Sequence, residues 1–426
     1  MNAPRRVSPE PARRGWCPSL ARPMPTGDGL LARIHPPLGV ISPTQARTVA
    51  TGARRYGNGH IDVTARANLQ VRGVSEETGP KLAALLDVAG LGDVRNDGGP
   101  QRLTLTAPLS GRDVIALAHA VEQIGVGIPH LPAKAVVTIE AVATLPVRGQ
   151  PERAGDFWGT EPDIRLVVVA PDRFAVAFAG SDWHGDIEVE RLPVIVGAAL
   201  RILAASGQRR MRDLHTGDLA ASLGLRSRSM PPLSPLRPAG ISPLADGRTA
   251  LLLDTPFGRC TADALDRLAD QAEAMDSEIH LSPTRGFAIL AADETALRSA
   301  RDALADLFIT EPDDPRRAVA ACPGAPACGS GSTSTLVDAA RLAAVFEPLA
   351  ARGLSAHVSG CSKGCAHPGA ASLTLVGRDG YYGIVLDGRP DALPTTLLTF
   401  DAALDRVRSA EYPRLDALAH AFRTQT

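Results

Sequence analysis

Residues 37–66 read PLGVISPTQARTVATGARRYGNGHIDVTAR, and residues 256–285 read PFGRCTADALDRLADQAEAMDSEIHLSPTR. The two stretches align almost without gaps in a step of 219 residues, so that Arg66 falls on Arg285. Few residues are identical. What recurs is the order of a Pro-x-Gly turn, a helix, a strand and an arginine. This recurrence indicates that the chain carries two copies of one structural unit.

The helix of the first copy has well-marked ends. Ser42 is an N-cap candidate, Pro43 suits the first helical position, and Gln45 completes a capping box. Thr261 can cap the helix of the second copy. Alternating apolar residues then predict short strands, which lie at 61–63, 69–71, 103–105, 279–281 and 287–289. Helices between short strands predict an α+β fold, with the copies related by a pseudo-twofold axis and a ligand groove between them.

The bulk composition excludes some classes of protein. The 426 residues carry a net charge of -1, whereas a general nucleic-acid binder carries a large basic excess. The most apolar stretch, residues 193–200, is far shorter than the roughly 20 residues that cross a bilayer. Residues 1–14 lack the apolar core of a secretory signal and are interpreted as a disordered leader. We therefore expect a cytoplasmic protein with no membrane or nucleic-acid partner.

Four of the six cysteines lie within 44 residues, spaced as C-x5-C, 32 intervening residues and C-x3-C. Thiolate is a soft ligand that suits iron–sulfur clusters and zinc. Zinc sites usually use tighter C-x2-C knuckles, whereas a cuboidal cluster is wider. The flanking segments CPGAPACGSGSTS and SGCSKGCAHPGA are rich in glycine, which lets backbone N–H groups approach inorganic sulfide. The pattern predicts a 4Fe-4S cluster on Cys322, Cys328, Cys361 and Cys365.

Two other interpretations of these cysteines stay open. Free cysteines are common core residues, although two pairs in glycine-rich segments are an unusual core arrangement. Zinc is the second alternative, with His367 as a further ligand, although His367 also suits a local structural role. Cys17 and Cys260 stand apart in the sequence, and both are interpreted as structural.

The cysteine spacing at the end of a duplicated α+β chain resembles that of the sulfite and nitrite reductase superfamily. Three N-terminal segments resemble it too: LARIHPPLGVIS, YGNGHIDVTARANLQVRG with its Thr-x-Arg-x-x-x-Gln pattern, and LPAKAVV with its Leu-Pro-x-Lys pattern. The resemblance covers residues 14–388. It implies ferredoxin-like half-domains at 15–78 and 231–295, an α/β domain at 79–230, and a 4Fe-4S-binding α/β domain at 296–426.

Within the superfamily, RGWCPSLARPMPTGDGLLARIHPP and the short length resemble the branch that acts in aerobic cobalamin (vitamin B12) synthesis. This resemblance implies a monooxygenase that hydroxylates precorrin-3A at C20 with O2 and closes a γ-lactone. It also implies a second iron centre, either sirohaem or non-haem iron, beside the 4Fe-4S cluster. The sequence shows neither a flavin domain nor an NAD fingerprint, so an external NAD(P)H-linked electron donor is expected.

Precorrins carry many carboxylates, and arginine binds a carboxylate bidentately. Arg33, Arg66, Arg102 and Lys134 fall on positions that the superfamily uses for tetrapyrrole and substrate, and Gln70 and Asn68 are expected to add hydrogen bonds. For any single arginine, a solvated surface charge is the ordinary alternative. The residues indicate no general acid or base, so the catalytic group stays unknown.

One departure bears on the reaction. Sulfite reductases of the superfamily carry a second lysine two residues after the first, and this chain has Val136 there. The loss disfavours six-electron sulfite reduction. The alternatives are a sirohaem-dependent sulfite or nitrite reductase, and a non-catalytic electron-transfer protein that would need no basic pocket.

Overall fold

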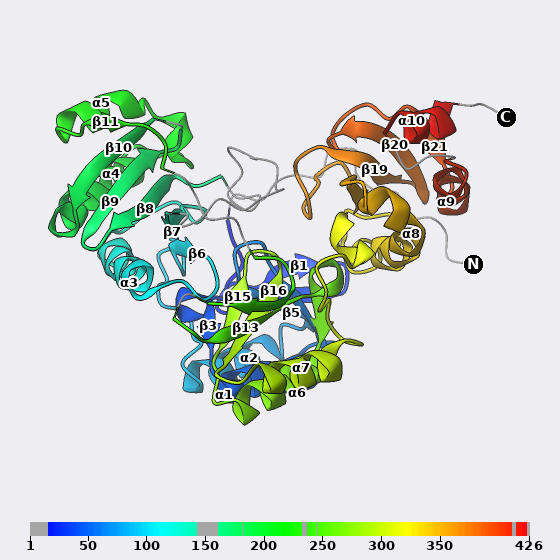
Figure 1. Cartoon of the computed structure of the whole chain (residues 1–426), viewed down its shortest axis with the longest axis horizontal. Helices are drawn as coiled ribbons and strands as arrows, with labels where there is room; N and C mark the ends of the chain where they lie inside the picture. The colour runs from blue at the N-terminus through cyan, green and yellow to red at the C-terminus, as the bar shows by residue number, and fades with distance from the viewer. Residues whose placement is uncertain are drawn as a thin grey trace.

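The computed structural model describes residues 16–142, 161–180, 182–231, 237–244, 246–410 and 415–423, so the leader expected at 1–14 lies outside it. Helices and strands alternate along these ranges (Figure 1). The helices are α1 Pro43–Tyr56, α2 Gly79–Val88, α3 Arg112–Val126, α4 Leu192–Ala205, α5 Thr216–Ser222, α6 Ala262–Ala274, α7 Glu294–Leu304, α8 Thr335–Ala350, α9 Phe400–Arg408 and α10 Leu415–Arg423. The strands form four sheets, which confirms the α+β class.

Two antiparallel sheets lie together at the centre of the molecule and exchange their last strands. The first has the order β1 (Met24–Thr26), β2 (Gly29–Ile34), β5 (Leu69–Val74), β4 (His60–Val63) and β14 (Arg259–Thr261). The second has the order β12 (Gly240–Pro243), β13 (Thr249–Asp254), β16 (Gly286–Ala291), β15 (Ile279–Ser282) and β3 (Val40–Ile41). This reciprocal exchange confirms the duplication and its pseudo-twofold relation.

Helices α1 and α6 pack against each other, so the two copies share one hydrophobic core. The predicted capping box is present, because Ser42 Oγ accepts from the Gln45 N–H at 3.1 Å and Gln45 Oε1 accepts from the Ser42 N–H at 3.0 Å. Thr261 caps α6 by accepting from the Ala264 N–H at 3.1 Å. Each helix therefore begins where the sequence predicts.

The predicted match of Arg66 with Arg285 is wrong by one residue. Val63 pairs with Leu69 in one hairpin and Leu281 pairs with Phe287 in the other, so the hairpins align in a step of 218 residues. The slip arises because α1 has 14 residues and α6 has 13. Arg285, at φ 68°, therefore corresponds to the residue after Arg66.

An outer sheet flanks the central pair on each side (Figure 1). One has the order β11 (Ser227–Arg228), β10 (Trp183–Glu188), β9 (Arg173–Phe178), β8 (Ile164–Ala170), β7 (Val137–Ala141) and β6 (Thr104–Thr106). The other has the order β17 (Val319–Ala321), β18 (Ala356–Ser359), β19 (Ala371–Arg378), β20 (Tyr381–Gly388) and β21 (Thr396–Leu398). Helices α3 and α4 complete the core of the first, and α8, α9 and α10 that of the second.

In each outer sheet, three neighbouring strands run parallel: β6, β7 and β8 in one, and β17, β18 and β19 in the other. The carboxyl ends of parallel strands meet at one edge of a sheet, where ligands commonly bind. The two cysteine pairs follow β17 and β18, so the topology places both pairs at one such edge.

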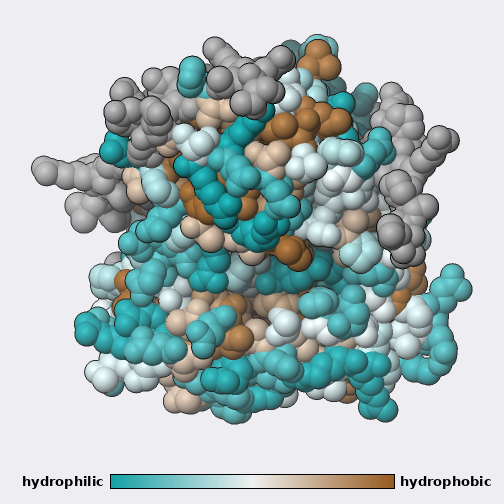
Figure 2. Space-filling view, turned by 90° about the vertical axis from the view of Figure 1, so that its right-hand side faces the viewer, coloured by the Kyte–Doolittle hydropathy of each residue, from teal (hydrophilic) through white to brown (hydrophobic). Residues whose placement is uncertain are grey.

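No helix within the described ranges is long and apolar enough to cross a membrane. On the side that carries the C-terminal sheet, apolar residues form small patches among hydrophilic ones (Figure 2).

Candidate cofactor and anion-binding site

The structure brings the four predicted cysteine ligands together. The Gly360 N–H, beside Cys361, donates to Cys322 Sγ at 3.1 Å, which joins the two loops directly. Burial, followed by the charges of the neighbouring Cys322, Cys361 and Cys328, raises the pKa of Cys365 to about 11. Mutual influence of this kind requires all four thiols to lie close to one another.

Glycine is required where the two loops touch. Gly324 has φ +60°, and a Cβ there would lie 2.3 Å from Thr335 Oγ1. A Cβ on Gly360 would lie 3.2 Å from Gly324 Cα and 3.5 Å from Cys322 Sγ. A side chain at position 324 would therefore clash with the backbone of its own loop, whereas one at position 360 would require the neighbouring backbone to shift slightly.

The donor set fits a 4Fe-4S group better than a zinc ion. Within the described part of the chain, no three His, Cys, Asp or Glu side chains converge closely enough to hold a single metal ion. Zinc needs its ligands on one centre at about 2.3 Å from sulfur, whereas each thiolate of a cuboidal cluster binds a different iron. His367 Nε2 lies 3.2 Å from the Ala370 carbonyl oxygen, which matches its expected local structural role.

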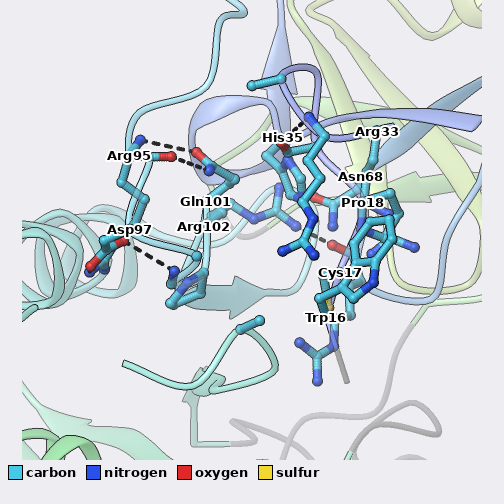
Figure 3. Close-up of a pocket in the computed structure, with 18 of the residues that line it drawn as sticks. Trp16, Cys17, Pro18, Arg33, His35, Asn68, Arg95, Asp97, Gln101 and Arg102 are labelled. Carbon is cyan, nitrogen blue, oxygen red and sulfur yellow. Dashed lines mark hydrogen bonds and ion pairs between the residues drawn. The ribbon is translucent and has the colours of Figure 1, made fainter. Parts of the chain in front are cut away.

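A cavity of about 270 Å³ lies in the N-terminal half, where three predicted arginines meet (Figure 3). Arg33 comes from strand β2, Arg66 from the turn after β4, and Arg102 from the segment before β6. Arg102 is held by the carbonyl oxygens of Pro36 and Ala67, each at 3.1 Å, and by that of Arg66. Three separate segments thus direct guanidinium groups into one space.

Two other predicted residues, Gln70 and Lys134, do not line this cavity but hydrogen-bond to arginines that do. With its amide oxygen turned toward Arg33, Gln70 accepts from Arg33 Nε at 2.8 Å. The Lys134 carbonyl oxygen accepts from Arg66 Nη2 at 3.0 Å. Lys134 itself lines a neighbouring cavity together with Arg209. Both cavities include Ala133 in their walls.

The cavity is strongly cationic. Burial lowers the pKa of Arg33, and it lowers the pKa values of Arg66 and Arg102 to about 10 each. All three groups therefore remain charged near neutral pH. Burial, followed by the charges of Arg33, Arg102 and Arg66, lowers the pKa of His35 well below its usual range, so this imidazole is neutral. The arrangement suits an anion with several negative groups.

Sequence reasoning missed several lining residues. Cys17, interpreted as structural, lies in the cavity wall with Arg33 and Arg66. His35 could have been found, because it lies two residues after Arg33 along the chain. Asn68 was not missed, because it was expected to add hydrogen bonds: it lines the cavity, is 5% exposed, and its Oδ1 has no hydrogen-bond partner within the described structure, so it is free to bind a ligand.

Residues 22–89 match the family model of the nitrite/sulfite reductase ferredoxin-like half domain. The chain is 33% identical over 403 residues to the precorrin-3B synthase of Sinorhizobium sp, covering 90% of this chain and 85% of that protein. The chain belongs to the precorrin-3B synthase family. It is a member of the nitrite and sulfite reductase superfamily, as the half-domain match indicates.

At lower identity, the chain is also similar to nitrite reductases and to the solved NirA protein. The chain is 24% identical to the ferredoxin–nitrite reductase of Synechococcus elongatus, covering 86% of this chain and 79% of that protein. The solved structure of the Mycobacterium tuberculosis NirA protein superposes with a TM-score of 0.68 at 19% identity, covering 93% of this chain and 84% of that one. The chain thus shares its fold with NirA.

Proposed function

We propose that the protein is a precorrin-3B synthase that hydroxylates precorrin-3A at C20 with O2 and forms a γ-lactone in aerobic cobalamin synthesis. The observation that carries this proposal is the 33% identity to a precorrin-3B synthase over 90% of the chain. One atom of O2 adds to C20 as a hydroxyl group, and the ring A acetate carboxyl bonds to the adjacent carbon of the same double bond, so that the π bond is consumed and the γ-lactone closes without a leaving group. The second oxygen atom leaves as water, with two electrons and two protons from an external NAD(P)H-linked donor.

The cationic cavity suits a tetrapyrrole with many carboxylates. Arg33, Arg66 and Arg102 offer planar donor groups for bidentate carboxylate binding. A cavity of about 270 Å³ is small for a whole macrocycle, so we assign it to the carboxylate arms at one edge. These arginines would orient the ring so that C20 faces the oxidant.

We assign a 4Fe-4S cluster to Cys322, Cys328, Cys361 and Cys365. When bound, the cluster supplies electrons one at a time, beside a second iron centre that is either sirohaem or non-haem iron. The thiolates hold the group, and the glycine-rich loops bring backbone N–H groups toward it, as the Gly360 N–H approaches Cys322 Sγ. Arg285 Nη2 donates to the Ala366 carbonyl oxygen at 2.9 Å and so supports the loop of Cys365.

A second candidate is a sirohaem-dependent sulfite or nitrite reductase, which the similarity to nitrite reductases favours. Val136 weighs against it. This residue lines the cavity and is 3% exposed, so the cavity lacks the second lysine that sulfite reductases place there. An apolar wall at that position offers no charge to a small oxyanion.

Anaerobic purification with iron, sulfide and haem analysis, followed by assay with precorrin-3A and 18O2, tests the proposal. We expect a coloured iron–sulfur protein whose product contains one labelled oxygen atom. Reduction of sulfite or nitrite without precorrin turnover would support the second candidate instead. A colourless protein without iron would contradict both.

A further inference from the structure

The carbonyl oxygen of Ala327, immediately before Cys328, is bound by two donors from the N-terminal half-domain. The Gly27 N–H donates to it at 3.1 Å, and Arg72 Nη2 donates to it as well. Ala327 and Arg72 are both buried, so the bond from Arg72 lies away from solvent, whereas Gly27 is exposed. A residue more than 250 positions away in the sequence thus contacts the first cysteine loop directly.

Arg72 is held rigidly in this position. It is 2% exposed, its Nε donates to Asp28 Oδ2 at 2.9 Å, and its Nη1 donates to Asp62 Oδ2 at 3.0 Å. Asp62 also accepts from Arg259 Nε at 2.6 Å. The carboxylates of Asp62, which is buried, and Asp28, which is half-buried, are therefore balanced by two guanidinium groups, which satisfies the requirement that buried charges be paired.

At position 27 there is no space for a side chain beside the cysteine loop. A Cβ at this position would lie 2.0 Å from the Pro326 carbonyl oxygen and 3.0 Å from the Cys328 carbonyl carbon. Real Cβ atoms do not approach backbone oxygen so closely, so any side chain here would displace the loop. Gly27 and Arg72 thus act on the same short segment by different means.

The strand that carries Arg72 also reaches the arginine cavity. Gln70 and Arg72 lie on β5 two residues apart, so their side chains share one face of the sheet. Gln70 is the register partner of Arg33 on one side and of Asp62 on the other. A single face of the central sheet therefore contacts both the anion-binding cavity and the cysteine loop.

We infer that Arg72, together with the Gly27 backbone, is a positioning residue for the Cys322–Cys328 loop, and that strand β5 fixes this loop relative to the arginine cavity. The inference rests on the cluster assignment made above. Arg72 does not touch the cysteines and is not a catalytic residue. It sets the place of Cys328 through the Ala327 carbonyl, as outer-sphere partners do in other metal sites.

The test compares four variants of the full-length protein. Arg72→Met removes the donor, and Arg72→Met with Asp28→Asn removes it while restoring charge balance. Gly27→Ala displaces the loop without altering the ion pairs. Arg259→Met is the matched control, because Arg259 binds the same Asp62 carboxylate but has no recorded contact with the cysteine loops within the described residues.

Three readouts are measured: the rate of cluster loss to an iron chelator, the EPR spectrum of the reduced cluster, and hydrogen exchange of the 322–331 segment in metal-free protein. We expect cluster loss to accelerate by about tenfold or more in the first three variants, with altered EPR signals and faster exchange. Arg259→Met should stay within about twofold of wild type, because the Ala327 contacts are intact.

Wild-type rates and spectra in both Arg72→Met and the charge-balanced double variant would overturn the inference. Equal effects in Arg259→Met would overturn it too, because the ion network rather than the Ala327 contact would then be responsible. If Arg72→Met does not fold, Gly27→Ala decides the question on the same readouts. Should wild-type protein lack iron and sulfide, the cluster assignment fails, and hydrogen exchange still tests the positioning role.

Discussion

Arg33 on β2 and Gln70 on β5 are register partners, and the Gln70 amide oxygen accepts from both Arg33 Nε at 2.8 Å and Arg33 Nη2 at 2.5 Å. This bidentate contact fixes the guanidinium at the cavity wall. Gln70→Ala should therefore weaken binding of the tetrapyrrole substrate by about three- to tenfold, the range for one or two lost hydrogen bonds. Equilibrium binding of precorrin-3A measures the effect. Unchanged affinity would show that Arg33 does not depend on Gln70.

The arginines of the cavity should differ in importance from Lys134. Arg66→Ala should weaken tetrapyrrole binding by about 1.5–3 kcal/mol, because a charge-assisted contact is lost. Lys134→Ala should cost less than about tenfold, because Lys134 lines the neighbouring cavity rather than the arginine cavity. Both variants should keep the visible absorption of the cluster. Normal binding by Arg66→Ala would contradict the assignment of this cavity.

Loss of a single cysteine ligand should remove the cluster. Cys361→Ser should abolish iron and sulfide content, visible colour and activity together. Cys260→Ala is the control, since Cys260 lies on β14 away from the cysteine loops, and burial raises the pKa of its thiol to about 12. Metal analysis of both variants checks the prediction. Full iron content in Cys361→Ser would refute the ligand set.

Glu140 should make stability depend on pH. Burial raises the pKa of Glu140 from 4.5 to about 7, an effect only partly opposed by Arg165. Between these values the folded protein binds more protons than the unfolded chain, so the free energy of unfolding falls as pH rises. Glu140→Gln should remove this slope.

Urea unfolding of wild type and Glu140→Gln at several pH values measures this effect. Relative to wild type, the variant should gain up to about 3 kcal/mol as pH rises from about 5 to about 8, which is the linkage energy of such a shift. Parallel pH profiles for the two proteins would show that Glu140 is ionised in the folded state.

Much of the fold was predictable because its signals are local. The capping residues Ser42 and Gln45 contact each other within one helical turn, and strands such as β4 and β5 follow alternating apolar residues. The one-residue error at Arg285 arose where the two copies differ in helix length. Because few residues are identical between the two copies, aligning their sequences does not reveal this one-residue shift.

The candidate site was predictable in part. The spacing of the four cysteines was enough to predict them as ligands. The resemblance to the superfamily indicated Arg33, Arg66 and Arg102, and in the structure all three line one cavity. The position of Cys17 was not predictable, because this residue reaches the cavity through a segment held by the Asp93 carboxylate at Leu20 and Ala21. Contacts across more than 70 residues have no local sequence signal.

The sequence by itself determined the duplication, the ends of the helices and the two glycine-rich cysteine loops, because each depends on residues that are near neighbours along the chain. Only the tertiary structure decided that the central sheets exchange β3 and β14, that Arg72 binds Ala327, and that separate arginines face one cavity. These relationships depend on how distant strands pack and pair. The free energy of that packing is summed over the whole shared core and cannot be assigned to any one stretch of sequence.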